Sequence, residues 1–331
     1  MTRNVPTDAE LAASLDGDFT SAYAEVNGTR LHHVTGGAGE PLILLGGWPQ
    51  TWWQFRKILP ELALRYRVTA VDLRGMGGSA KPAGGYDKKT MARDIHELIR
   101  QLGHRSAFVV GHDIGASLGY HLAANFPESV RRLVTVDMGV PDAAWQAITM
   151  LPGSDDQAAA LEHGRGGYPW WFAFNQLREL PEQLLAGRFR LVIDWLYGHM
   201  LVDQASVEEE ARRIYAHAYD SPDAIRAGNG WYQTMRQDIA DLAGYAPVTV
   251  PILTLAGEES YPALRQQMSA DKGTDIRVVE IKGSGHYIPE EQPGQMVREL
   301  TAFFESSAVA SAQRFRAPAQ AEIGASSSQG G

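Results

Sequence analysis

Short runs of apolar residues recur along the chain, and turn-forming residues separate them. Several runs are continuous, which is typical of strands that are buried on both faces of a parallel sheet. Near the N-terminus two further apolar stretches, Ala22–Val26 and Leu31–Val34, flank Asn27-Gly28, a dipeptide that favours a tight hairpin turn. The predicted strands of the main sheet are Leu42–Leu45, Val68–Asp72, Ala107–Val110, Leu133–Asp137, Ile252–Ala256 and Val278–Ile281.

Helical periodicity fills the stretches between these strands. The clearest helix precedes the third strand and ends at Gly103. Its apolar face consists of Met91, Ile95, Leu98, Ile99 and Leu102. Alternating strands and helices predict an α/β fold, with a mostly parallel sheet, right-handed crossovers and helices on both faces.

The alternation breaks after the fourth sheet strand and resumes near residue 248, which suggests a helical cap over residues 141–247. We expect this cap to cover the carboxyl edge of the sheet, where open α/β sheets bind ligands. The α/β core then consists of residues 19–140 and 248–306. Residues 1–18 are predicted to be a loose leader, and residues 307–331, rich in Ala, Ser, Gln and Gly, a disordered tail.

Composition excludes several classes of function. The formal net charge is −9 and the chain has no basic run, which argues against nucleic-acid binding. The absence of cysteine excludes disulfides, a thiolate nucleophile and cysteine metal sites. No apolar run approaches the ~18 residues that a membrane span needs, and the charged N-terminus is unlike a signal peptide. We therefore expect a cytoplasmic protein without cofactor, metal or membrane partner.

The third sheet strand runs directly into Gly111-His112-Asp113-Ile114-Gly115. A strand, a glycine-flanked turn and a helix form a nucleophile elbow, in which the middle residue projects from the sheet edge. That residue is Asp113. A second match to the elbow pattern, centred on Ser117, lies about one turn inside the helix, so position favours Asp113.

A general base is expected in the loop after the last strand. His286 stands there, and its place after Asp113 agrees with the chain order of nucleophile, acid and histidine. The acid that orients the histidine is either Asp137 or Glu259, since both follow strands that end at the same sheet edge. Asp137 is preferred because it terminates its strand, whereas Glu258 is expected to be a solvated loop carboxylate.

Backbone N–H groups are expected to complete the site. Small residues precede Trp48, so its N–H can point toward the elbow and form an oxyanion hole with the N–H of Ile114. The glycine-rich loop Asp72–Ser79 lacks the dinucleotide-binding pattern at a helix start and is given a structural role.

Taken together, these residues resemble the α/β-hydrolase superfamily and, within it, the epoxide hydrolase branch. The resemblance covers residues of about 20–305. It is carried by Gly46-Gly47-Trp48-Pro49-Gln50, Asp72-Leu73-Arg74-Gly75, Gly111-His112-Asp113-Ile114-Gly115, Leu180-Pro181-Glu182 and Gly285-His286. Members with an aspartate at the elbow are chiefly epoxide hydrolases, haloalkane dehalogenases and fluoroacetate dehalogenases.

Departures from the family patterns favour epoxide hydrolysis. Haloalkane dehalogenases usually carry Trp at the position of Ile114, and fluoroacetate dehalogenases carry Arg there and at the position of Ser117. Epoxide hydrolases hold the epoxide oxygen with cap tyrosines, a role that the resemblance gives to Tyr232. The second tyrosine or histidine is replaced by tryptophan in the segment Tyr168-Pro169-Trp170-Trp171, and the usual histidine of the first loop is replaced by Gly46.

The implied reaction is attack by Asp113 on an epoxide carbon, protonation of the oxygen by Tyr232 and hydrolysis of the ester by water that His286 activates. The partners are therefore a small-molecule epoxide and water, and a homodimer is compatible with the sequence. Trp170, Trp171 and Trp231 are candidates for lining the site, which favours a bulky aromatic substrate. The alternatives are a haloalkane or haloacid dehalogenase, a serine esterase using Ser117, and a non-catalytic binding protein.

Overall fold

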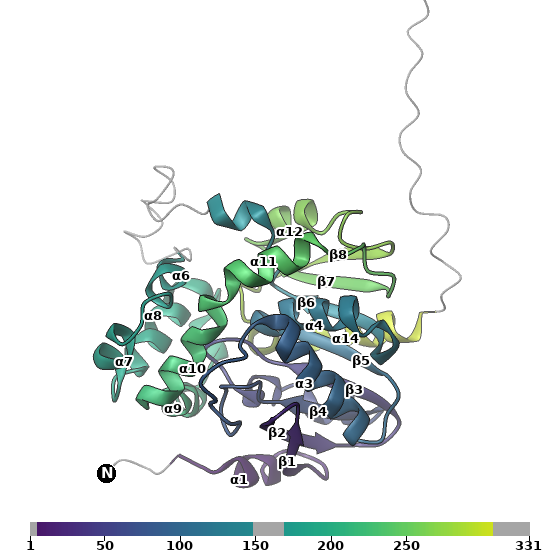
Figure 1. Ribbon diagram of the computed structural model, residues 1–331. Helices are drawn as coiled ribbons and strands as arrows, with labels where there is room; N and C mark the ends of the chain where they lie inside the picture. The colour runs from purple at the N-terminus through teal and green to yellow at the C-terminus, as the bar shows by residue number, and fades with distance from the viewer. Residues whose placement is uncertain (1–4, 148–168, 307–331) are drawn as a thin grey trace, which may run out of the picture.

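The computed structural model describes residues 5–147 and 169–306. Its centre is an eight-stranded sheet with the order β1-β2-β4-β3-β5-β6-β7-β8 (Figure 1). The first two strands pair antiparallel with their neighbours, and all other pairs are parallel. The strands are β1 (Thr20–Val26), β2 (Thr29–Gly36), β3 (Glu40–Leu45), β4 (Tyr66–Val71), β5 (Ala107–His112), β6 (Val130–Val136), β7 (Ile252–Gly257) and β8 (Ile276–Ile281).

Each predicted strand is present to within a few residues, and the α/β fold class is confirmed. The predicted hairpin is also present. Asn27 and Gly28 both have positive φ, 43° and 71°, and Val26 pairs with Thr29. Positive φ at both central residues is what a two-residue type I′ turn requires.

Apolar side chains of the strands alternate between two cores, one on each face of the sheet. In β3, Ile43 and Leu45 join one core, whereas Leu42 and Leu44 join the other. The first core also contains residues of α3 (Lys88–Gln101) and α4 (Ile114–Asn125). The second contains residues of α1 (Asp8–Ala13), α2 (Leu59–Ala63) and α14 (Pro293–Glu305). Because both faces are covered, the strand sequences are continuous rather than alternating.

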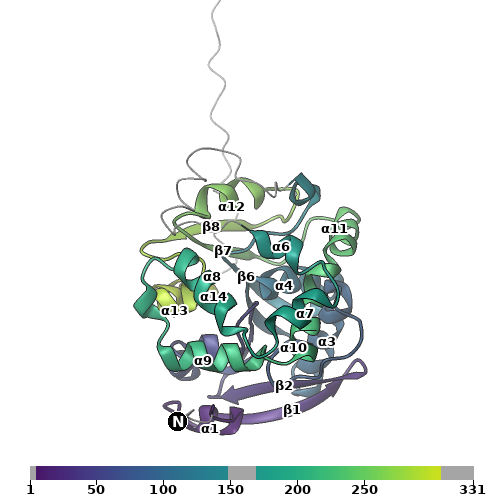
Figure 2. The same cartoon turned by 90° about the vertical axis from the view of Figure 1, so that its left-hand side faces the viewer.

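Between β6 and β7 the described chain forms helices joined by loops, with an isolated bridge at Val248. Several of its helices gather beside the sheet, as Figures 1 and 2 show from two directions. We call residues 169–243 the helical insertion. Its helices are α6 (Trp170–Phe174), α7 (Leu180–Leu185), α8 (Arg190–Met200), α9 (Glu209–Ala218), α10 (Pro222–Gln233) and α11 (Met235–Ala243). The remaining α-helices are α12 (Tyr261–Gln267) and α13 (Ile288–Glu291).

The N-terminal segment differs from the predicted loose leader. Residues 8–13 form α1, which begins with a capping box between Thr7 and Glu10 and buries Leu11 and Ala12. Asp8 accepts a hydrogen bond of 2.7 Å from the indole N–H of Trp52. This helix is therefore packed onto the core, while the predicted disordered tail, residues 307–331, lies outside the described residues.

Within the described ranges, no helix is long and apolar enough to span a bilayer.

Candidate active site

Asp113 stands at the sharp turn between β5 and α4. Its φ of 53° is positive, a strained value for a residue with a side chain. A Cβ on Gly111 would lie 2.0 Å from the carbonyl oxygen of Gly115, and one on Gly115 would lie 2.2 Å from that of Leu45. Only glycine fits these close approaches, so the turn has the geometry predicted for a nucleophile elbow.

The structure brings His286 and Asp137 to this turn. Nε2 of His286 lies 3.6 Å from Oδ2 of Asp113. Nδ1 of His286 lies 2.8 Å from Oδ2 of Asp137, which is a hydrogen bond. The imidazole is thus held between two carboxylates, one at each ring nitrogen.

Asp137 rather than Glu259 is the carboxylate that contacts the histidine. Its other oxygen, Oδ1, accepts a hydrogen bond of 2.7 Å from Gly257 N and another from the hydroxyl of Ser260. Glu258 and Glu259 are exposed. Ser260 was not anticipated from the sequence, although its place in a strand-end loop is the relevant signal.

The backbone N–H group of Trp48 donates to Oδ1 of Asp113 at 2.9 Å. The backbone N–H group of Ile114, the next residue, helps to hold the pKa of the Asp113 carboxyl below its ordinary value. A Cβ on Gly47 would lie 2.3 Å from the Cβ of Asp113. Glycine at position 47 therefore permits the close approach that the Trp48 donor needs.

His286 and Asp113 form a buried pair, and each shifts the pKa of the other. Burial by itself lowers the pKa of His286, but hydrogen bonds and attraction to Asp113 and Asp137 raise it to about 10. Burial raises the pKa of Asp113, yet His286 holds it below its ordinary value. The pair therefore rests as carboxylate and imidazolium.

A second histidine, His112, supports this arrangement. Its Nε2 lies 2.9 Å from the backbone oxygen of His286, and its Nδ1 lies 2.7 Å from Oε1 of Gln54. Complete burial lowers the pKa of His112 to about 4. Gly46 makes room for Gln54, because a Cβ at position 46 would lie 2.2 Å from the Gln54 amide nitrogen.

Tyr232 is buried, and its ring packs edge-on against those of Trp48 and Phe172 at centroid distances of 5.5 and 5.3 Å. Burial and the negative charge of Asp113 raise the pKa of Tyr232 well above its ordinary value, and a hydrogen bond with the Trp171 side chain opposes this shift. Tyr232 therefore keeps its proton, close to the carboxylate and within reach of an indole N–H.

The other two tryptophans predicted to line the site have different surroundings. Trp170 packs against Trp195 within the helical insertion, with ring centroids 5.4 Å apart. Trp231 is fully buried, and its indole N–H donates to the backbone oxygen of Arg74 at 2.9 Å. This contact fastens α10 to the loop after β4, so Trp231 has the environment of a packing residue.

Ser117 is buried inside α4. Its hydroxyl has no hydrogen-bond partner within the described part of the chain. A nucleophilic serine needs a base within hydrogen-bond reach, and His286 contacts Asp113 instead.

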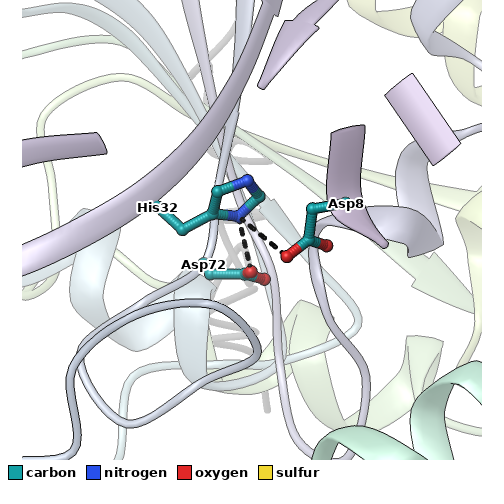
Figure 3. Close-up of side chains that lie close together, drawn as sticks. All are labelled: Asp8, His32 and Asp72. Atoms are coloured by element: carbon teal, nitrogen blue, oxygen red, sulfur yellow. Dashed lines mark hydrogen bonds and ion pairs between the residues drawn. The ribbon is translucent and has the colours of Figure 1, made fainter. Parts of the chain in front are cut away.

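Among the described residues, Asp8, His32 and Asp72 are the group with the spacing of a metal site (Figure 3). Nδ1 of His32 lies 2.8 Å from Asp72 Oδ2 and 3.9 Å from Asp8 Oδ2. Asp72 also accepts from the N–H groups of Trp52 and Gly78. Burial lowers the pKa of His32, but Asp72 and Asp8 raise it above its ordinary value. The atoms that would bind a metal are thus already engaged in hydrogen bonds and ion pairs with one another and with the backbone. We therefore describe the cluster as a set of ion pairs that joins α1 to the sheet.

Comparison with known proteins places this geometry in a family. The α/β-hydrolase fold family matches residues 40–198. A soluble epoxide hydrolase of Corynebacterium sp. (strain C12) is 32% identical over 295 residues, covering 87% of this chain and 98% of that protein. A fluoroacetate dehalogenase of Burkholderia sp is 27% identical over 303 residues, covering 87% and 95%. The solved structure of the epoxide hydrolase CorEH without ligand has a TM-score of 0.67 at 32% identity, covering 87% of this chain and 99% of that one.

The fold and these relatives define a hydrolytic enzyme. The chain belongs to the α/β-hydrolase superfamily and, within it, to the epoxide hydrolase-like branch.

Proposed function

We propose that this enzyme hydrolyses an epoxide to a vicinal diol through a covalent ester on Asp113. The observation that carries the proposal is the environment of that carboxylate. Its Oδ1 accepts from Trp48 N at 2.9 Å, which leaves Oδ2, beside His286, to attack carbon. The family relationship to a soluble epoxide hydrolase supports the substrate class.

In the first half-reaction Oδ2 of Asp113 forms a bond to one epoxide carbon, and the bond from that carbon to the ring oxygen breaks. The electron pair moves to the oxygen, which takes the phenolic proton of Tyr232. Trp171 assists only by donating a hydrogen bond, because an indole N–H is no practical acid. Burial and the nearby Asp113 carboxylate raise the pKa of Tyr232, so the phenol is protonated when the carboxylate attacks.

The second half-reaction hydrolyses the ester. Once Asp113 is esterified its negative charge is gone, so one of the two carboxylates that raise the pKa of His286 no longer acts. The imidazole then loses its proton more readily and takes one from water, while Asp137 keeps the ring oriented. Water attacks the ester carbonyl, and the N–H groups of Trp48 and Ile114 stabilise the oxyanion. The bond from the carbonyl carbon to the diol oxygen then breaks, that oxygen takes a proton from His286, and the carboxyl proton left on Asp113 returns to the imidazole. The proton that His286 lost before it acted as a base restores the phenol of Tyr232.

The aromatic surroundings of the site support a bulky, flat substrate. Rings of Trp48, Trp171, Phe172 and Tyr232 lie close together, and helices of the insertion provide the last three. We propose that the insertion acts as a cap that encloses an aryl epoxide and excludes bulk water. Good turnover of short aliphatic epoxides, with none of any aryl epoxide, would overturn this part of the proposal.

The decisive experiment is a single turnover in ¹⁸O-labelled water with enzyme in excess over styrene oxide. An ester that water cleaves at its carbonyl carbon transfers an unlabelled oxygen from Asp113 to the first diol formed. Solvent label in that first diol would show direct attack by water and would contradict the mechanism.

Dehalogenation is a second candidate, because the first displacement is the same and a fluoroacetate dehalogenase is among the relatives. The donors Trp171 and Tyr232 are also suited to a departing halide. Ile114 and Ser117, however, stand where that class carries arginines, so a carboxylate substrate lacks its clamp. Release of bromide from a bromoalkane, measured beside epoxide turnover, tests this activity.

A further inference from the structure

The loop that carries His286 is fastened to the helical insertion. The backbone N–H of His286 donates to Met200 O, at the end of α8, over 3.1 Å. A Cβ on Gly285 would lie 2.1 Å from the same oxygen, so glycine allows the two segments to touch. The position of the catalytic histidine therefore depends on residues of the insertion.

Glu291, at the end of α13, joins the same two segments through its side chain. One carboxylate oxygen, Oε1, accepts from Val202 N at 2.6 Å and from Asp203 N at 3.3 Å. The other, Oε2, accepts from Gly285 N at 2.8 Å and from the Ser284 hydroxyl at 3.3 Å. One oxygen thus binds the insertion, and the other binds the backbone directly before His286.

A carboxylate is suited to this place because all four groups that face it are donors. An amide at position 291 has a single oxygen, and its NH₂ group faces backbone N–H groups on one side or the other. Replacement by glutamine therefore keeps the size of the side chain and frees one of the two segments.

We propose that Glu291 is a positioning residue for the general base: it holds the His286 loop against the insertion and is needed for ester hydrolysis but not for ester formation. This inference rests on the proposed function, because it assumes an ester on Asp113. His286 acts as a base only after the ester exists, so a misplaced imidazole delays the second half-reaction more than the first, in which its charge only lowers the pKa of Asp113. A displacement of about 1 Å at a reacting group slows a reaction by on the order of 100-fold.

The test measures the two half-reactions separately in Glu291→Gln. Rapid-quench experiments with styrene oxide follow the covalent adduct by intact-protein mass, and single-turnover diol release follows its hydrolysis. We expect ester formation at the wild-type rate, ester hydrolysis slowed by about 10- to 100-fold, and accumulation of the adduct. The pH profile of ester hydrolysis should change.

Tyr215→Phe is the matched control. The hydroxyl of Tyr215, in α9, donates to Oε1 of Glu290 at 2.6 Å, so this variant also weakens a bond between the insertion and α13. It leaves every bond of Glu291 in place. We expect both half-reactions to keep their relative rates in this variant, even where its melting temperature falls.

Two outcomes overturn the inference: equal slowing of both half-reactions in Glu291→Gln, or adduct accumulation of the same size in Tyr215→Phe. His286→Gln separates these failures from failure of the proposed function. If that variant accumulates an adduct and Glu291→Gln does not, the role of Glu291 is wrong. If His286→Gln accumulates none either, the aspartyl ester itself is wrong.

Discussion

The two oxygens of Asp113 have different surroundings, and this difference assigns them different tasks. Oδ1 accepts from Trp48 N, whereas Oδ2 lies 3.6 Å from the imidazole of His286. The carboxylate already occupies the N–H groups that would later stabilise an oxyanion. Attack by Oδ2 therefore needs no reorganisation of the donors, which is the main advantage of a preorganised site.

Removing the charge of Asp113 should lower the pKa of His286. In Asp113→Asn the burial that lowers this pKa persists, while one of the two carboxylates that raise it is absent. We expect the imidazole, observed by NMR, to titrate clearly below the value of about 10 that holds with both carboxylates present. A histidine pKa that is raised on folding contributes stability at low pH, and this contribution is lost as the pH rises through the folded-state pKa. The variant should therefore lose it at a lower pH than the wild type.

The matched variant for this titration is Glu259→Gln, which removes an exposed carboxylate from a loop at the same sheet edge. It should leave the His286 titration unchanged. An unchanged titration in Asp113→Asn would instead mean that the two side chains do not interact as described.

Tyr232→Phe should slow ester formation by about 10²- to 10⁴-fold, the usual contribution of a general acid. Ester hydrolysis should keep its rate, because the epoxide oxygen is already protonated when water attacks. Rapid-quench measurement of the adduct checks both steps. Tyr219→Phe is the comparison, since that buried hydroxyl donates to Gln50 O at 2.9 Å. Equal loss of ester formation in the two variants would remove the special role of Tyr232.

At the scale of secondary structure, the site depends on how closely two turns approach each other. The loop after β3 brings Trp48 N to the elbow between β5 and α4, and the contact is made by Gly47 against Asp113. Both loops follow neighbouring parallel strands, so their carboxyl ends lie at one edge of the sheet. Glycine is therefore required at position 47 because the two loops approach each other so closely, and not because of the conformation of either loop alone.

Gly47→Ala should reduce epoxide turnover by on the order of 100-fold, because the new Cβ must push the Trp48 donor away from the carboxylate. Gly84→Ala is a matched change, as a Cβ at that exposed position meets no atom within 4 Å. Steady-state kinetics and a thermal melt of each variant check the expectation. Full activity of a folded Gly47→Ala variant would contradict the close approach.

For the whole molecule, the helical insertion is joined to the core by buried charges as well as by aromatic packing. Nζ of Lys88, in α3, lies 2.9 Å from Oδ2 of Asp238, in α11, and both side chains are about 3% exposed or less. Lys88 Nζ also donates to the backbone oxygen of Trp231. Buried pairs of this kind contribute little when intact but are harmful when one partner is removed.

Asp238→Ala should lower the free energy of unfolding by about 3–5 kcal/mol, because it leaves the ammonium of Lys88 buried without its counter-ion. Urea denaturation measures this loss. Glu305→Ala breaks an exposed ion pair, in which the side chain of Arg65 is 61% exposed and that of Glu305 is 58% exposed. This variant should change the free energy of unfolding by less than ~1 kcal/mol. Similar losses in the two variants would show that the Lys88 pair is effectively solvated.

Local pattern explains why much of this protein is predictable. Three local patterns predict elements that the structure contains: the continuous apolar runs, the turn at Asn27-Gly28 and the glycines around Asp113. The helix α1 was also readable, since Thr7 and Glu10 have the spacing of a capping box and precede Leu11. The prediction of a loose leader did not take this cap into account.

The sequence by itself determined the order of strands and helices, the elbow at Asp113 and the place of His286 after the last strand, because short-range spacing and turn chemistry specify them. Tertiary structure alone decided which carboxylate meets His286, that Trp171 rather than Trp170 contacts Tyr232, and that Glu291 fastens the histidine loop. These choices depend on contacts between segments far apart in sequence. Which of these segments meet depends on how the sheet and the helical insertion pack, so a local sequence pattern cannot predict it.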